Sequence, residues 1–317
     1  MIGSLMAAAL AVSAFQDPPV APPPQPQDPT VYRLEEIVVE GTRLEERTAE
    51  YVREVAAPAR GRGPARWRQG VCVGAANFDP EVAQYLVDRV SDVARDLGLS
   101  AGQPGCEPSI LIVGTTGGAD FAREFVAMRP RLFRVGGSGM DRGSAALEVF
   151  MSSDRPVRWW HVSMPTDSET GQRAVRLPGE MRPMPNLDPR QDVLGYAPIT
   201  RVPVASRIQS SVEDRMMRSF VIIDVDRLGG VSLEQLGDYV AMVALVQVNP
   251  DADTRRYETI LNLFEYPDGI AGLSGWDRAY MEGIYATRPG RISTMAQVQS
   301  ITQAILSAYR GQQEEAE

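Results

Sequence analysis

The sequence predicts an α+β fold, in which a mixed sheet packs on a buried central helix and a helical C-terminal portion follows. Two short apolar runs, 109–114 and 220–225, have the length and composition of buried strands. The second half of residues 232–248 is apolar nearly all round, which predicts a helix enclosed by the core. Apolar residues recur at helical spacing in 274–285 and 294–309, which predicts the C-terminal helices.

Length and composition favour one core domain. The chain has 317 residues, of which 44% are apolar. We expect a single α+β domain over residues 71–311, preceded by an N-terminal extension and followed by a disordered acidic tail, 312–317. The formal net charge is -9. This charge disfavours general nucleic-acid binding, because phosphate contacts need a clustered positive field.

Residues 1–14 are predicted to be a signal peptide. An apolar run from Leu5 to Val12 ends in small residues suited to signal peptidase, although no Arg or Lys precedes it. A disordered apolar tail is the alternative. No run reaches the roughly 20 apolar residues of a membrane span, so we expect none in the mature chain. With the Pro-rich linker 15–30, this predicts a periplasmic or secreted protein.

The two cysteines, Cys72 and Cys106, are predicted to form a disulfide. An even pair in an exported chain favours a disulfide over a metal site, which would need more ligands. Closing a loop of about 34 residues should stabilise the fold by roughly 3 to 4 kcal/mol. Two unpaired buried thiols would be the better interpretation for a cytosolic chain.

The N-terminal extension, 31–70, contains a candidate partner strand. Its centre, Glu-Glu-Ile-Val-Val-Glu-Gly at 35–41, resembles the segment near the mature N-terminus of TonB-dependent outer-membrane receptors. The resemblance implies that Ile37, Val38 and Val39 could pair with the edge of another protein's sheet. The alternative is an ordinary strand leading into the next helix.

The rest of the extension is predicted to be a helix and an Arg-rich linker. Thr42 and Glu45 have the spacing of a capping box for a helix over 42–57, which should dock on the core or on a partner. Residues 58–70 hold four arginines around Trp67 and no acidic residue. Such a segment could contact anionic headgroups or cell-wall phosphates, or could be a solvated linker.

The first half of the core domain is predicted to alternate strands and helices. Asp79 is a plausible N-cap for an amphipathic helix over 80–98. The glycine-rich stretch 114–120 joins a strand to the next helix, 120–128, and matches neither the dinucleotide fingerprint nor the P-loop. We therefore interpret it as turn geometry rather than as a phosphate site.

Residues 144–153 and 156–165 are predicted to be strands, and the second contains the only histidine, His161, beside Trp159 and Trp160. If this strand lies at a sheet edge above a cleft, these rings could line a peptide groove. The alternative is a histidine packed in the core or in an interface. The Pro-rich stretch 179–198 is predicted to be a surface loop.

The segment around the central helix carries the main resemblance. A strand is followed by the turn Gly229-Gly230, by Ser232 as N-cap with Gln235 in a capping box, and by a long buried helix. This layout resembles the active-site helix of zincin metallopeptidases, whose pattern is His-Glu-x-x-His, and the segment 274–285 is similar to the C-terminal subdomain of secreted metallopeptidase-like proteins.

The positions that match the zincin motif are Glu234, Gln235 and Asp238. Zinc in such a site needs imidazole ligands and a carboxylate base, and Gln235 cannot accept a proton, so we expect no zinc and no other cofactor. The two carboxylates could hold a harder cation with help from Asp224 or Asp226. The structural alternative is that Glu234 interacts with the helix dipole and Asp238 points to solvent.

These observations lead to three functional hypotheses. The first is a catalytically degenerate, metallopeptidase-like protein that binds protein or peptide in the cell envelope. The second is a hydrolase that uses Glu234 and Asp238, with or without a metal, and with His161 as a further candidate; it requires these side chains to meet in one pocket. The third is an envelope adaptor that uses the strand 35–41.

Overall fold

The computed structural model describes residues 43–56, 64–68, 70–133, 143–167, 171, 212–287 and 294–316, all within one compact unit, Arg43–Glu317. Several sequence-based expectations lie outside these ranges. They are the signal peptide, the Pro-rich linker, the strand at Ile37–Val39, the cap at Thr42 and the loop 179–198.

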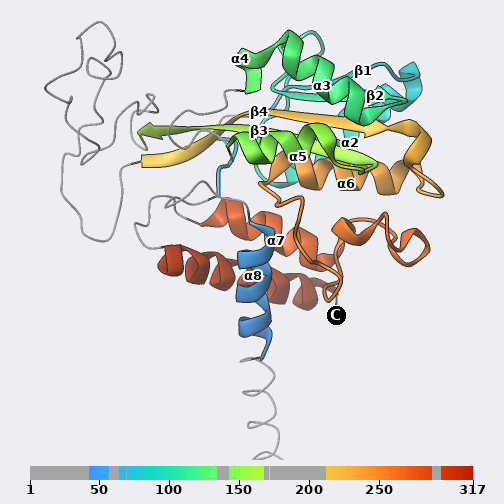
Figure 1. Ribbon diagram of the computed structural model, residues 1–317. Helices are drawn as coiled ribbons and strands as arrows, with labels where there is room; N and C mark the ends of the chain where they lie inside the picture. The colour runs from blue at the N-terminus through green and yellow to red at the C-terminus, as the bar shows by residue number, and fades with distance from the viewer. Residues whose placement is uncertain are drawn as a thin grey trace, which may run out of the picture. The chain divides into compact units, whose positions relative to one another are not determined.

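The described part of the chain contains a mixed sheet of four strands, as the sequence predicts. These are β1 Val73–Ala76, β2 Ile110–Thr115, β3 Val157–Asp167 and β4 Val212–Asp224, in the order β1-β2-β4-β3. The first two and β4 are parallel, and β3 is antiparallel to β4. The strand order therefore leaves β3 at one edge (Figure 1).

One face of the sheet is covered by α2 Pro80–Asp96 and α6 Leu233–Leu245. The Asp79 side chain accepts a hydrogen bond from the backbone N–H of Glu81 at 3.0 Å, which confirms the predicted cap of α2. Every residue of α6 from Leu236 to Leu245 is buried. The buried central helix is therefore confirmed.

The opposite face is covered by α3 Gly118–Met128, α4 Pro130–Phe133 and α5 Ser144–Ser152. The prediction of a strand over 144–153 is wrong. The segment is rich in Ala, Leu, Glu and Met, which are strong helix formers. As a helix it brings Leu147 and Phe150 onto one face, where both are buried against the aromatic cluster of this layer.

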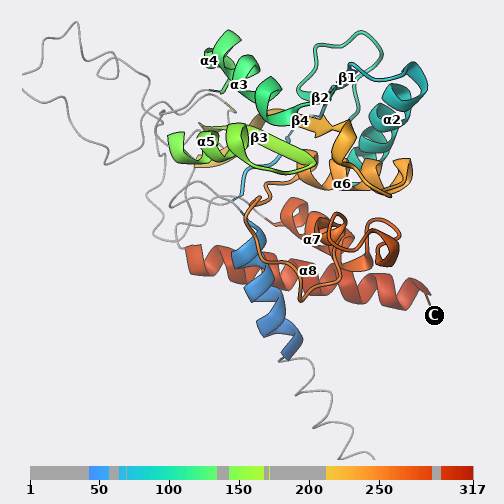
Figure 2. The ribbon, with the colours of Figure 1, turned by 45° about the vertical axis from the view of Figure 1, so that its right-hand side comes forward.

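A third layer lies beyond α6, formed by α7 Gly275–Ala286 and α8 Thr294–Ala316 (Figures 1 and 2). The short 3-10 turns Val225–Arg227, Ile260–Asn262 and Pro267–Gly269 connect the layers. The helix α8 continues to Ala316, so the expectation of a disordered tail is wrong for residues 312–316.

The N-terminal helix, residues 43–55, docks on this third layer. The Tyr51 ring is fully buried and lies 4.8 Å from the ring of Tyr257, 5.5 Å from that of Trp276 and 5.3 Å from that of Tyr280, between centroids. Docking on the core was one of the two predicted possibilities.

The expectation of a solvated Arg-rich linker is wrong for Arg66 and Trp67, which are both buried. The Arg66 guanidinium donates hydrogen bonds to the carbonyls of Ile284 and Tyr285, which are left open at the end of α7. The indole N–H of Trp67 donates to the carbonyl of Ala244 at 3.2 Å. These contacts tie the segment 64–68 to α6 and α7.

The predicted disulfide is confirmed. Cys72 and Cys106 are bonded, with their Cα atoms 6.1 Å apart, and the bond joins the residue before β1 to the loop that precedes β2. Within the described ranges, no helix is both long enough and apolar enough to cross a membrane.

Candidate functional site

The Gln235 side chain stabilises the start of α6 through hydrogen bonds. Its Oε1 accepts the backbone N–H of Ser232 at 2.7 Å, and the Ser232 hydroxyl accepts the N–H of Gln235 at 3.2 Å, which confirms the capping box. The Nε2 group of Gln235 donates to the carbonyls of Pro267 and Ile270. A loop thus fills the space above Gln235. Glu234 is exposed in the first turn, where the helix dipole favours a carboxylate.

Asp238 is a buried structural residue rather than one that points to solvent. Its Oδ1 forms an ion pair with Arg89 of α2, and its Oδ2 accepts the backbone N–H of Leu273 at 2.7 Å. The hydrogen bond with Asp238 raises the pKa of the Arg89 guanidinium. A Cβ atom at Gly272 would lie 2.4 Å from Oδ2 of Asp238, so the loop approaches this carboxylate closely.

His161 lies in β3 and contacts the other end of α6. Its Nε2 is 2.6 Å from the carbonyl oxygen of Val243. Two cavities lie next to β3, and neither is lined by Glu234, Gln235 or Asp238. The structure does not bring the three motif positions together with His161 in either of them.

The glycine-rich turn after β2 is occupied by the protein's own carboxylate. The backbone N–H of Gly118 donates to Oδ2 of Asp224 at 2.9 Å, at the end of β4. A Cβ at Gly114 would lie 2.6 Å from the Phe78 ring, and one at Gly118 would lie 2.9 Å from the Arg158 guanidinium. Close packing therefore requires glycine at 114, where a Cβ would also lie 2.9 Å from the backbone oxygen of Asn77, whereas at 118 the Arg158 side chain could shift. Among the described residues, no group of three or more His, Cys, Asp or Glu could hold a metal ion.

The outer edge of β3 is the candidate functional site. Asp224 donates its N–H to the carbonyl of Pro156 at 2.8 Å, so Pro156 and Asp224 face each other as a hydrogen-bonded pair of the β3–β4 ladder. In an antiparallel ladder such pairs alternate with pairs whose backbone groups point away from each other. The N–H and C=O groups of Val157 and Trp159 therefore point away from β4, on the outer side of the outermost described strand, where Val157 is 1% and Trp159 7% exposed.

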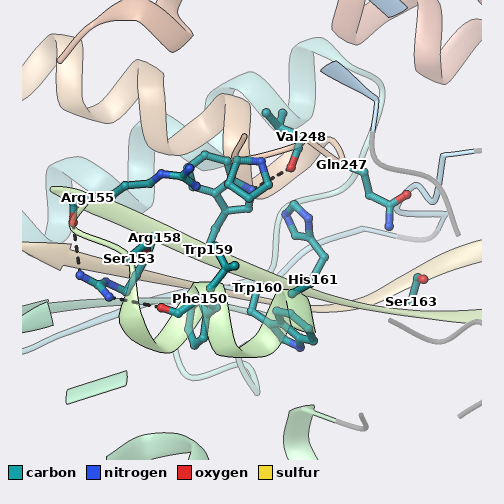
Figure 3. A pocket seen from close by; sticks show the side chains of 13 residues that line it. Phe150, Ser153, Arg155, Arg158, Trp159, Trp160, His161, Ser163, Gln247 and Val248 are labelled. Carbon is teal, nitrogen blue, oxygen red and sulfur yellow. Dashed lines mark hydrogen bonds between the residues drawn. The ribbon is translucent and has the colours of Figure 1, made fainter. Parts of the chain in front are cut away.

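A small cavity of about 40 Å³ lies against this edge, between α5 and the segment 247–250. Figure 3 shows the rings of Trp159 and His161 on one side of β3 and those of Trp160 and Phe150 on the other. The indole N–H of Trp159 donates to the carbonyl of Val248 at 3.0 Å, which fixes that ring. The cavity by itself has room only for a few water molecules.

A larger cavity of about 370 Å³ shares Arg155, Trp159 and Pro250 with the small one. Its aromatic wall combines three elements: the rings of Trp159 and Tyr239 are 6.1 Å apart between centroids, and those of Tyr239 and Phe264 are 4.9 Å apart. Tyr239 is 6% exposed, and its hydroxyl has no hydrogen-bond partner among the described residues. Burial raises the pKa of Tyr239 well above its ordinary value, so the hydroxyl is neutral.

The rim of the larger cavity is charged. Arg155 pairs with Asp251 at 2.6 Å, and Arg255 forms two bonds of 2.9 Å with the Asp253 carboxylate. Glu265 is exposed and forms no ion pair with another described residue. The cavity is therefore an aromatic recess with two ion pairs and one further carboxylate, Glu265, which Arg255 attracts without forming an ion pair with it.

The loop that forms this rim is stabilised by buried hydrogen bonds. Asn262 donates to the carbonyls of Thr254 at 3.0 Å and Tyr257 at 2.9 Å, and the Thr254 hydroxyl donates to Oδ1 of Asn262 at 2.6 Å. Both side chains are buried. The cavity wall is thus formed before any ligand binds.

Sequence reasoning found part of this site and missed the rest. It singled out Trp159, Trp160 and His161, on the condition that their strand lies at an edge, and the strand order satisfies that condition. It missed Tyr239 and Glu265. The available signal was that Tyr239 is the one aromatic residue in the helix α6.

Comparisons of this chain with protein-family models, curated proteins and solved structures found no match. The resemblances to zincin metallopeptidases and to TonB-dependent receptors therefore stay predictions.

Proposed function

We propose that this chain is an exported binding protein that holds an extended segment of a protein or peptide along the outer edge of β3. The observation that carries the proposal is the meeting, at Trp159, of the outermost described strand with a preformed aromatic cavity. The backbone of a bound segment would pair with β3, while one of its side chains would enter the cavity.

The edge supplies general affinity, and the cavity supplies selectivity. An added strand would lie about 4.8 Å from β3 and exchange hydrogen bonds with the backbone of Val157 and Trp159. Successive side chains of an extended segment point to opposite faces, so alternate ones would face the side where Trp159 and Tyr239 form the cavity wall. Only those side chains would be selected.

Binding is better supported than hydrolysis. The residues expected to carry hydrolysis have other roles: Gln235 is bonded to Ser232 and to two loop carbonyls, and Asp238 is bonded to Arg89 and Leu273. Using Asp238 as a base would break a buried ion pair, which is strongly destabilising. The disulfide Cys72–Cys106 supports an oxidising compartment, in keeping with a partner in the cell envelope.

The proposal is tested by selecting binders from a displayed random peptide library on the purified, oxidised protein. Ala252 lines the larger cavity, and Ala252→Trp should fill it. We expect selected peptides to bind with micromolar affinity and to lose at least about tenfold on Ala252→Trp. Ala286→Trp is the matched control, because Ala286 is exposed and lines neither cavity.

Amide hydrogen exchange gives an independent measurement of where the peptide lies. Bound peptide should slow exchange of the Val157 and Trp159 amides, because pairing with an added strand would protect them. Peptides that bind equally well to Ala252→Trp, and that leave these two amides unprotected, would contradict the proposal.

A further inference from the structure

We infer that the larger cavity selects a basic side chain, best that of arginine, from the bound segment. The inference rests on the proposed function, because it names the residue class that the site recognises.

The walls suit a flat cation. The rings of Trp159, Tyr239 and Phe264 form a cluster in edge-to-face contact, with adjacent centroids 6.1 Å and 4.9 Å apart. A cation within about 6 Å of such a ring is attracted to its face, most strongly by tryptophan. Arginine adds stacking to this attraction, because its guanidinium is planar and weakly hydrated.

The Tyr239 hydroxyl provides a polar contact inside the recess. Tyr239 lines the cavity and is 6% exposed, and its hydroxyl forms no hydrogen bond with another described residue but is not one of the buried polar atoms that water cannot reach. A side chain that enters the cavity would displace water from this hydroxyl, so a ligand that donates a hydrogen bond to it is favoured over one that leaves it without a partner. A guanidinium has five such N–H groups.

The charges at the rim favour a cation over an anion. Three carboxylates and two arginines line the cavity. Asp251 is paired with Arg155, and Asp253 is bound by two groups of Arg255. This leaves Glu265 without an ion pair, although Arg255 attracts it at longer range, and a bound cation would neutralise this carboxylate further. An acidic side chain would meet this charge unfavourably, and an aliphatic one would leave the Tyr239 hydroxyl unpaired.

The experiment uses single-residue probes and nuclear magnetic resonance titration of the oxidised protein. The probes are N-acetylarginine N-methylamide, its citrulline analogue, which has nearly the same shape without the charge, and the leucine and phenylalanine analogues. We expect the arginine probe to shift the resonances of Trp159 and Tyr239 and to bind about tenfold more tightly than citrulline.

Two variants and one control assign the effect to the cavity. Glu265→Gln should weaken the arginine probe by about fivefold, and Tyr239→Phe by about threefold, since each removes one contact to the cation. Tyr239→Phe should fold normally, because the hydroxyl it removes is unpaired. Glu258→Gln is the matched control: Glu258 is an exposed carboxylate of the same loop region and does not line the cavity.

The outcomes separate this inference from the proposed function. Equal binding of the arginine, citrulline and leucine probes would overturn the inference, as would an arginine affinity that Glu265→Gln and Glu258→Gln change alike. If library peptides bind at β3 without a basic residue, the proposed function stands and the inference fails. If the arginine probe binds but no peptide protects the Trp159 amide, the cavity preference stands and pairing along the strand fails.

Discussion

Trp159 and Tyr239 meet edge to face, with their ring centroids 6.1 Å apart and their planes at 71°. One ring comes from the edge strand β3 and the other from the central helix α6. The contact therefore connects the most buried helix of the core to the strand on which the proposed binding site lies.

Trp159→Phe should reduce both stability and binding. The substitution removes the hydrogen bond from the indole to the carbonyl of Val248 and leaves that buried carbonyl without the donor. We expect a loss of about 1 to 3 kcal/mol in the free energy of unfolding, measured with urea. Met217→Leu changes an exposed apolar residue of the neighbouring strand β4 and should stay within about 0.5 kcal/mol of wild type. Equal stability of the two variants would show that the Trp159 contacts do not support the fold.

Asp238→Ala should destabilise the fold because it leaves Arg89 without its partner and the N–H of Leu273 without its acceptor. We expect a loss of about 2 to 4 kcal/mol from this largely buried pair. Asp92→Ala breaks the exposed pair with Arg95 and is the matched control, with an expected loss below about 1 kcal/mol. Urea unfolding of both variants measures the difference. An unchanged unfolding curve for Asp238→Ala would contradict the structural role that we assign to this carboxylate.

Reduction of the disulfide should lower the free energy of unfolding by about 3 to 4 kcal/mol, because the bond closes a loop of 34 residues in the unfolded chain. The double variant Cys72→Ala/Cys106→Ala should show the same loss without added reductant. Urea unfolding with and without dithiothreitol provides the measurement for wild type. Stability that is independent of reductant, in a protein shown by mass to be reduced, would be inconsistent with this estimate.

Asp277 should make stability depend on pH. The residue is fully buried, and burial raises the pKa of its carboxyl above 3.8, against hydrogen bonds from Thr259, Ile260 and Ser274 that lower it. The folded state therefore binds the proton more tightly than the unfolded state does. The stabilisation from this proton is complete below pH 3.8 and is lost as the pH rises through the pKa of the folded state.

Asp277→Asn mimics the protonated form, so it should remove this dependence. We expect the free energy of unfolding of the variant to increase relative to that of wild type as the pH is raised from about 4 to 7, because only wild type loses the stabilisation from the proton. Asp92→Asn serves as the control at an exposed site. A difference between Asp277→Asn and wild type that is constant across this range would contradict the raised pKa.

The local pattern of the chain was sufficient to predict many helices and strands. Asp79 as a cap and Ser232 with Gln235 as a capping box follow from short-range chemistry, which does not depend on the rest of the fold. The apolar second half of α6 predicted its complete burial, because an all-round apolar helix has no face to present to water. The disulfide followed from an even cysteine count in a chain expected to be exported.

Other features depended on partners far away in the chain. The start of β4 contains Glu213, Asp214 and Arg215, so it does not resemble a buried strand, and the predicted strand began only at Phe220. Glu213 is nevertheless buried, because Arg68 lies 3.0 Å away from its carboxylate. Pairing of this kind cannot be read from local sequence, since it appears only when the segment 64–68 packs beside β4.

By itself the sequence determined the α+β class, the buried central helix, the disulfide and the aromatic strand around His161, because each depends on periodicity, composition or neighbours in the chain. Only the tertiary structure decided that this strand lies at the sheet edge, that Gln235 and Asp238 are bound to loops and to Arg89, and that Tyr239 faces a cavity beside Glu265. The physical reason is that strand order and side-chain partners are set by packing between segments distant in the chain, and the cavity exists only where those segments meet.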